Sequence, residues 1–343
     1  MTATLSALVC ALTPAATARA ATVAVENVDS CLDDVACSKY AAGHPVPVTV
    51  FTGTTGEANR VTVMREGDTW AIRDAGAPLS GCPPIDGGVR CPVTAGEGER
   101  IPGLRILLGD GDDSVTLTSD VPASVDAGAG ADTVTGGSAN ETIDGGPGAD
   151  TLNGGPGLDT LSFASRTVPV SVDLAAGTTG EGDHVVAFET VLGGQAGDVL
   201  RGSRGSDTLL GGPGADRLLG GAGDDSLDGG RGSDRLFGEG GDDTLSGDPE
   251  QGDDYYTPII KMGDDLLDGG PGDDRLEEAG GGHNVFRGGP GRDEISGGTA
   301  ADRVLGGPGR DRIVVRGGGR DNVNCGSGRD TAIADHRDAL RSC

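Results

Sequence analysis

Residues 202–246 read GSRGSDTLL, GGPGADRLL, GGAGDDSLD, GGRGSDRLF and GEGGDDTLS, five nine-residue units in succession without a gap. Each unit has an Asp at its sixth position and an apolar residue two positions later. The apolar series consists of Leu209, Leu218, Leu227, Leu236 and Leu245, a spacing that a solvated low-complexity tract has no reason to keep. A fixed repeat of this length predicts a solenoid, in which stacked units bury one continuous apolar row.

Glycine and acidic residues dominate the composition. The chain has 65 Gly among 343 residues, 3% aromatic residues and a formal net charge of −28. Taken alone, these values are typical of disordered chains, and without metal we expect disorder, because metal binding and folding are coupled. Residues 105–286 carry 9 basic and 35 acidic residues. Stacked units bring these acids close together, so the sequence predicts cations between them and excludes nucleic acid as a partner.

The first 20 residues have the pattern of a cleaved signal peptide. Leu5 to Leu12 form a short apolar run, and Ala18-Arg19-Ala20 matches an A-x-A cleavage site, although no Lys or Arg precedes the run. We therefore expect a secreted, extracellular protein. No other stretch approaches the roughly 18 apolar residues that span a bilayer, so no membrane span is expected.

Six cysteines follow the predicted cleavage site in three close pairs. The pairs are Cys31 and Cys37, Cys82 and Cys91, and Cys325 and Cys343. Local pairing of an even number of cysteines in an exported chain predicts three disulfides. Zinc is the alternative, but no C-x-x-C motif occurs and the four histidines are scattered.

The repeats extend in both directions from the perfect block. A first interruption, residues 163–192, contains Val168, Val170, Val172 and Leu174 in a period-two pattern, which predicts a strand within enlarged turns of the same stack. A second interruption, Asp248 to Met262, predicts a protruding loop. The expected order is signal peptide 1–20, N-terminal β-rich domain or solenoid cap 21–104, first repeat block 105–162, insert 163–192, second repeat block 193–333 and C-terminal cap 334–343.

The chemistry of one unit follows from its residue types. Glycines at the first, second and fourth positions permit close backbone approach, so that carbonyl oxygens converge on a hard cation, and the Asp adds a carboxylate; oxygen ligands of this kind suit calcium. The residues around the eighth position fit a short strand with its apolar side chain turned inward. Two units then make one flattened 18-residue turn. Asp198, Asp216 and Asp234 are expected along one edge, and Asp207, Asp225 and Asp243 along the other.

GGPGADRLL and its neighbours match GGxGxDxUx and resemble the hemolysin-type calcium-binding repeat of the RTX family. The resemblance implies an all-β fold, a parallel β-roll (β-solenoid), in an exported protein that depends on multiple Ca²⁺ ions. The first interruption resembles the segment that often separates RTX blocks. The predicted metal ligands are Asp113, Asp132, Asp150, Asp159, Asp198, Asp207, Asp216, Asp225, Asp234, Asp243, Asp254, Asp265, Asp274, Asp293, Asp302 and Asp311.

Several units depart from the pattern. Glu141 and Asn284 stand at acid positions, and Arg310, Arg320 and Arg329 crowd the last units. We expect weak or empty sites at these places. An N-terminal signal and a C-terminal disulfide also differ from the uncleaved C-terminal export signal of many RTX proteins.

The N-terminal residues contain strand-like runs at Val46–Phe51, Arg60–Met64 and Trp70–Arg73. No H-E-x-x-H or G-x-S-x-G motif occurs, and no catalytic residue is predicted. The favoured function is a secreted, non-enzymatic, calcium-binding protein with a structural, cell-surface or matrix role, which is compatible with a cell-surface or polysaccharide partner. The alternative is an RTX-type secreted enzyme, carbohydrate-active or another hydrolase, whose site is not recognisable in the sequence.

Overall fold

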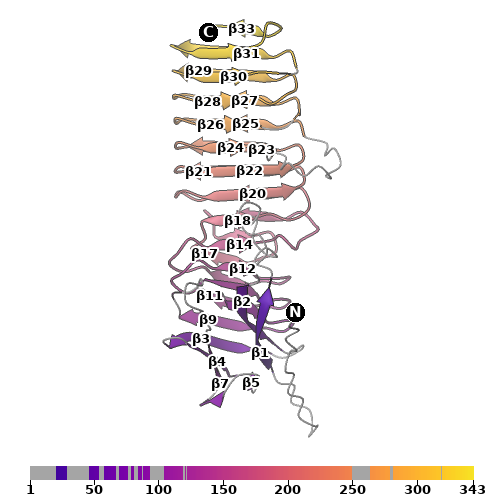
Figure 1. Ribbon diagram of the computed structural model, residues 1–343, viewed down its shortest axis with the longest axis vertical. Helices are drawn as coiled ribbons and strands as arrows, with labels where there is room; N and C mark the ends of the chain where they lie inside the picture. Colours follow the sequence, from indigo (N-terminus) through magenta and orange to yellow (C-terminus); the bar gives the residue numbers. More distant parts are fainter. Residues whose placement is uncertain are drawn as a thin grey trace, which may run out of the picture.

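The computed structural model describes residues 21–28, 46–53, 58–66, 69–75, 79–80, 84–86, 88–92, 104–118, 120, 122–248, 263–278, 281–317 and 319–343. These residues contain strands and no helix. Figure 1 shows an elongated stack of coils, with the C-terminus at one end and the N-terminal strands toward the other. The predicted all-β parallel β-roll is confirmed. Within the described residues, no helix is long and apolar enough to cross a membrane.

Two sheets run the length of the stack. Sheet A has 15 strands. In spatial order they are β5 (Leu79–Ser80), β1 (Ala21–Val28), β2 (Val46–Thr52), β8 (Leu104–Leu107), β10 (Ala123–Asp126), β12 (Thr142–Asp144), β14 (Thr160–Ser162), β18 (Thr190–Leu192), β20 (Thr208–Pro213), β22 (Ser226–Arg231), β24 (Thr244–Ser246), β26 (Arg275–Glu277), β28 (Glu294–Ser296), β30 (Arg312–Val315) and β32 (Thr331–Ala334).

Sheet B lies opposite and takes the alternate strands. Its pairings give the order β6 (Pro84–Ile85), β7 (Gly88–Pro92), β4 (Thr69–Asp74), β3 (Arg60–Glu66), β9 (Ser114–Thr118), β11 (Thr133–Thr135), β13 (Thr151–Asn153), β17 (His184–Val186), β16 (Thr178–Thr179), β15 (Ser171–Asp173), β19 (Val199–Arg201), β21 (Arg217–Ala222), β23 (Arg235–Gly240), β25 (Leu266–Asp268), β27 (Val285–Arg287), β29 (Arg303–Gly309), β31 (Asn322–Gly328) and β33 (Ala339–Arg341).

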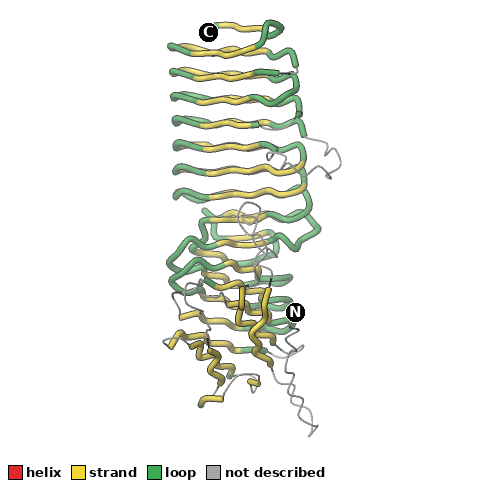
Figure 2. The backbone as a smooth tube through the Cα atoms, viewed as in Figure 1, coloured by secondary structure: helices red, strands yellow, loops and turns green. Residues whose placement is uncertain are grey.

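The register of the strands confirms the predicted 18-residue coil. Thr208 of β20 pairs in parallel with Ser226 of β22, and Ser226 pairs with Thr244 of β24, an offset of 18 residues at each step. One nonapeptide therefore supplies a strand of one sheet and the next nonapeptide a strand of the other. Figure 2 shows the result as strands joined by loops at both edges of each coil.

The core is the space between the two sheets, and it is one side chain deep from each sheet. Leu209 stacks on Leu227 in sheet A, and Leu218 on Leu236 in sheet B. These four leucines are at most 1% exposed. Full burial of a leucine stabilises by about 1.5–3 kcal/mol, so the row at the eighth position of the unit holds the coils together along the whole stack.

The first interruption widens sheet B. β17 continues the parallel ladder from β13, β16 and β15 follow antiparallel to their neighbours, and β15 resumes the parallel ladder to β19. Val170 and Val172 are buried as the period-two pattern predicts, but Val168 precedes the strand and is 59% exposed. The Arg166 guanidinium forms ion pairs with Asp144 (Nη1, 3.2 Å) and Glu181 (Nε, 3.1 Å), which tie the interruption to the coil before it.

The N-terminal strands continue the stack and cover its end. β2 pairs in parallel with β8, and β3 pairs in parallel with β9, so together they extend both sheets. β4 and β7 then add antiparallel strands beside β3. The expected strands at residues 46–51, 60–64 and 70–73 correspond to β2, β3 and β4.

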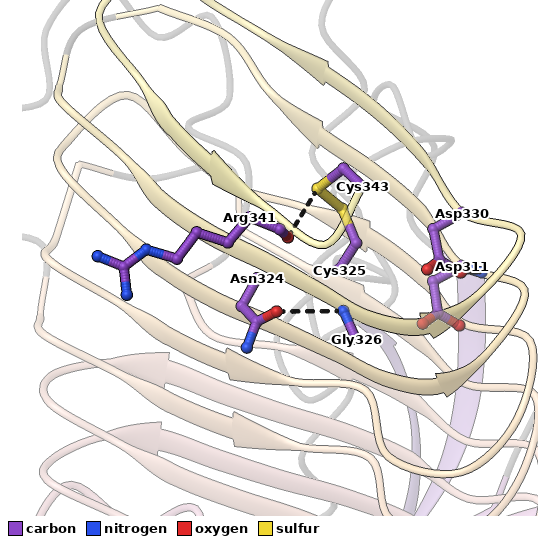
Figure 3. The surroundings of a disulfide bond; sticks show 7 residues. All are labelled: Asp311, Asn324, Cys325, Gly326, Asp330, Arg341 and Cys343. Atoms are coloured by element: carbon purple, nitrogen blue, oxygen red, sulfur yellow. Dashed lines mark hydrogen bonds between the residues drawn. A yellow bond between two sulfur atoms is a disulfide. The ribbon is translucent and has the colours of Figure 1, made fainter.

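A disulfide between Cys325 and Cys343 closes the other end (Figure 3). Cys325 lies in β31, and Cys343 follows β33, which pairs with β31 in the last coil. The two Cα atoms are 5.0 Å apart. This predicted pair is confirmed. Cys31, Cys37 and Cys82 lie outside the part of the molecule that the structure describes, as does the predicted signal peptide, whereas Cys91 lies in β7. The pairs Cys31–Cys37 and Cys82–Cys91 therefore stay predictions.

Candidate metal centres

Acidic residues stand at the start of nearly every strand, because each unit places its sixth position just before the strand. Strands alternate between the sheets, so the acids form two columns, which we call the sheet A ladder and the sheet B ladder. The sheet B ladder contains the predicted ligands Asp113, Asp132, Asp150, Asp198, Asp216, Asp234, Asp265 and Asp302. The sheet A ladder contains Asp159, Asp207, Asp225, Asp243, Asp274, Asp293 and Asp311. The predicted ligand Asp254 lies outside the described residues.

Each ladder is joined by hydrogen bonds between successive coils. The Asp198 N–H donates to Asp216 Oδ1 (2.6 Å), and the Asp216 N–H donates to Asp234 Oδ1 (2.8 Å). On the other edge, the Asp207 N–H donates to Asp225 Oδ1 (2.8 Å). Figure 3 labels one such pair near the C-terminal end, Asp311 and Asp330. One carboxylate oxygen of most of these acids thereby fixes the loop of the preceding coil, whereas Asp207 Oδ2 accepts the Ser203 N–H of its own unit (2.5 Å).

The second carboxylate oxygen has no hydrogen-bond partner at most positions. The Oδ2 atoms of this kind among the predicted ligands belong to Asp113, Asp132, Asp150, Asp159, Asp216, Asp225, Asp234, Asp243, Asp265, Asp274, Asp293, Asp302 and Asp311. All of these side chains are buried. A buried, unpaired carboxylate oxygen is strongly unfavourable unless a cation meets it, so its recurrence at one position of the repeat indicates a ligand.

The glycines of the unit define where that ligand would lie. A Cβ built at Gly211 would be 2.6 Å from Asp216 Oδ2 and 2.6 Å from the carbonyl oxygen of Gly229 in the next coil. The absence of a side chain at Gly211 therefore lets its backbone pack closely against a carboxylate oxygen and a carbonyl oxygen, two possible metal ligands. At the adjacent Gly212, φ is 91° and a Cβ would be 2.9 Å from the Gly194 carbonyl oxygen. Glycine adopts this backbone angle without strain and has no side chain to meet the neighbouring coil.

The pKa values of the ladder carboxyl groups are raised, as expected for buried acids that lie close to one another. Burial raises the pKa of Asp216 to about 6, with a further contribution from the Asp198 carboxylate. Burial raises the pKa of Asp225 to about 7, and the carboxylates of Asp243 and Asp207 add to the effect. Without a cation, these groups therefore resist ionisation near neutral pH. Calcium takes six to eight oxygen ligands, carboxylates and carbonyls among them, so the oxygens present fit it.

The departures from the repeat also enter the ladders. Glu141 is buried in the sheet A ladder, where Oε2 accepts the Gly137 N–H (2.9 Å) and Oε1 has no partner. Asn284 is buried in the sheet B ladder, where its Oδ1 accepts the Asp265 N–H (2.8 Å). Arg310, Arg320 and Arg329 are exposed beside the last acids.

The structure adds acids that the sequence prediction did not include. The Asp150 N–H donates to Asp183 Oδ1 (2.9 Å), and the Asp159 N–H donates to Glu189 Oε2 (2.9 Å), so the first interruption supplies one acid to each ladder. Each of these acids lies two residues before an inward Val, Val185 or Val191, a pattern visible in the sequence. Asp248 and Glu278, which stand at glycine positions, also lie buried beside Asp265.

Comparison with known sequences agrees with this geometry. The profile of the RTX calcium-binding nonapeptide repeat (4 copies) matches residues 125–161, 192–227, 219–251, 262–277 and 278–313. No curated protein sequence matches the chain. The ladders continue beyond the matched residues, to Asp113 at one end and Asp338 at the other. The chain thus carries RTX calcium-binding repeats across residues 125–313, and these repeats form a β-solenoid.

Proposed function

We propose that the protein is a secreted, non-enzymatic calcium-binding protein in which Ca²⁺ ions drive the folding of the roll. The observation that carries the proposal is the column of buried carboxylate oxygens without partners on each edge of the stack. Bound calcium would supply the positive charge that these oxygens lack. The glycines leave room for it, and the carboxylates hold adjacent loops at a fixed spacing.

The free energy of folding is expected to depend on calcium through ligand linkage. An ion that binds only the folded chain stabilises it by RT ln(1 + [L]/Kd). Extracellular calcium modules bind in the range of about 10⁻⁴ to 10⁻³ M. A chain with a net charge of −28 and a core one side chain deep from each sheet is then disordered at low calcium and folded at extracellular calcium.

Secretion and a structural role are supported by other features. The apolar run and A-x-A motif at the N-terminus are typical of export, and the disulfide between Cys325 and Cys343 suits an oxidising compartment. A long repetitive stack presents extended faces of regularly spaced side chains, a geometry suited to a cell-surface or matrix partner such as a polysaccharide.

Circular dichroism of the mature chain, titrated with calcium after chelation, tests the proposal. We expect a disordered spectrum in chelator and a saturable gain of β structure in the range of about 10⁻⁴ to 10⁻³ M calcium. Asp216→Ala and Asp225→Ala, on opposite edges, should each raise the calcium concentration at the midpoint. Asp224→Ala removes an exposed charge next to Asp225 and serves as the control. A β-rich spectrum that chelator leaves unchanged would contradict the proposal.

A further inference from the structure

Two buried acids stand at positions where the repeat usually has glycine. Asp248 occupies the second position of the unit that begins at Gly247 and is interrupted by residues 249–262. Glu278 occupies the first position of the following unit that supplies a sheet B strand, β27. Both side chains are buried, at 1% and 5% exposure. Two buried acids at positions reserved for the smallest residue call for a physical reason.

Asp248 and Glu278 meet Asp265 in one cluster. One carboxylate oxygen from each of the three residues lies within 4.8 Å of the other two. The Asp248 N–H donates to Glu278 Oε2 (3.2 Å), and the Gly263 N–H donates to Asp248 Oδ2 (3.1 Å). Asp265 Oδ1 accepts the Asp234 N–H (2.7 Å), whereas its Oδ2 is buried, accepts no N–H and lies in the cluster with the Glu278 carboxyl, which also interacts with Asp265.

The atoms around Gly247 differ from those around the glycine of an ordinary repeat site. A Cβ at Gly247 would be 2.7 Å from Asp265 Oδ2 and would also meet Glu278 Oε2. At Gly211 the corresponding space faces one carboxylate and the Gly229 carbonyl oxygen. A second carboxylate thus replaces a neutral carbonyl beside the unpaired oxygen.

We propose that Asp248, Asp265 and Glu278 form a separate calcium site, outside the nonapeptide pattern, that joins the two ends of the second interruption. Asp248 is the first residue of the second interruption and Gly263 directly follows the interruption, and the hydrogen bond between these two residues lies within the cluster. Three carboxylates together attract a hard divalent cation more strongly than one carboxylate with neutral carbonyl groups does, because ligand charge tunes calcium affinity. The neutral Asn284 in the next coil leaves this charge concentrated at one level of the stack.

The inference rests on the proposed calcium-binding function and makes a separate prediction. Calcium binding to the purified mature chain is measured by competition with a chromophoric chelator. We expect the wild type to bind one ion about tenfold or more tightly than the rest. Glu278→Gly and Asp248→Gly restore the residues of the repeat and should each abolish this tight ion, while the weaker ions bind with unchanged affinity.

Two controls keep the outcomes separate. Glu277→Gln removes the charge of the neighbouring side chain, which is 41% exposed, and should retain the tight ion. Circular dichroism in saturating calcium checks that each variant is folded. Persistence of the tight ion in both glycine variants, or a wild type whose ions all bind equally, overturns this site but leaves the proposed function standing. A wild type that binds no calcium overturns both.

Discussion

Substitution of Gly211 by alanine tests whether the space beside the carboxylates holds the ions. A Cβ at this position would be 2.6 Å from both Asp216 Oδ2 and the Gly229 carbonyl oxygen, whereas ordinary contacts begin at 3.4 Å. The acid loop and the next coil must therefore both move. Overpacking of this kind destabilises proteins by about 1–3 kcal/mol. The added methyl group also displaces the unpaired Asp216 Oδ2 and the Gly229 carbonyl oxygen, both possible calcium ligands, so calcium binding at this level should be lost.

Gly205 offers a matched control in the same block. It is exposed, and a Cβ there would have only Ser203 Oγ nearby, at 3.8 Å. Replacement of glycine by alanine at an unstrained position stabilises by about 0.4–1 kcal/mol. In saturating calcium, the urea midpoint should therefore fall in Gly211→Ala and rise in Gly205→Ala. The number of bound calcium ions should fall only in Gly211→Ala. Equal midpoints and equal stoichiometry in the two variants would refute the steric argument and the location of the ions.

The remaining predictions concern pH and the disulfide. In calcium-free buffer, the β structure measured by circular dichroism should decrease as the pH rises from about 4 to about 7, where the chain is disordered. The folded-state pKa values of Asp225, Asp234 and Asp274 are raised from 3.8 to about 7, so the folded state holds protons that the unfolded state has released. β structure that increases over this interval would exclude the effect, and saturating calcium should remove the decrease. Cys343→Ser removes the disulfide that joins residues 18 positions apart, which stabilises the fold by up to roughly 3 kcal/mol. Hydrogen exchange should increase in β31 and β33, while β20 to β24 remain protected. An equal increase along the whole stack would show that the disulfide does not act only on the last coil.

Much of the fold could be predicted because a solenoid is a local structure. The nine-residue phase of Leu209, Leu218 and Leu227 determines which side chains face inward, and stacking each coil on the last requires no long-range choice of partner. The same phase placed Asp216 and Asp225 on opposite edges. The acids of the first interruption, Asp183 and Glu189, were missed because the extra residues hide the phase.

The cluster at Asp248 lay beyond prediction for a different reason. Asp248 and Glu278 are 30 residues apart in the sequence and stand at positions where the pattern predicts no side chain. Their proximity arises only when the coil that begins at Gly247 and the coil that follows it are stacked. An acid at a glycine position can point outward or into the stack, and the contacts that the neighbouring coil offers determine which of the two occurs.

The sequence by itself determined the repeat, the all-β roll, the two columns of acids and the calcium chemistry of the family, because all of these depend on residue type and phase within one unit. The tertiary structure decided which carboxylate oxygen is used between coils and which stays unpaired, how the first interruption widens sheet B, and where three acids meet beside the second. Those features depend on contacts between coils, and such contacts exist only after the strands have paired in register.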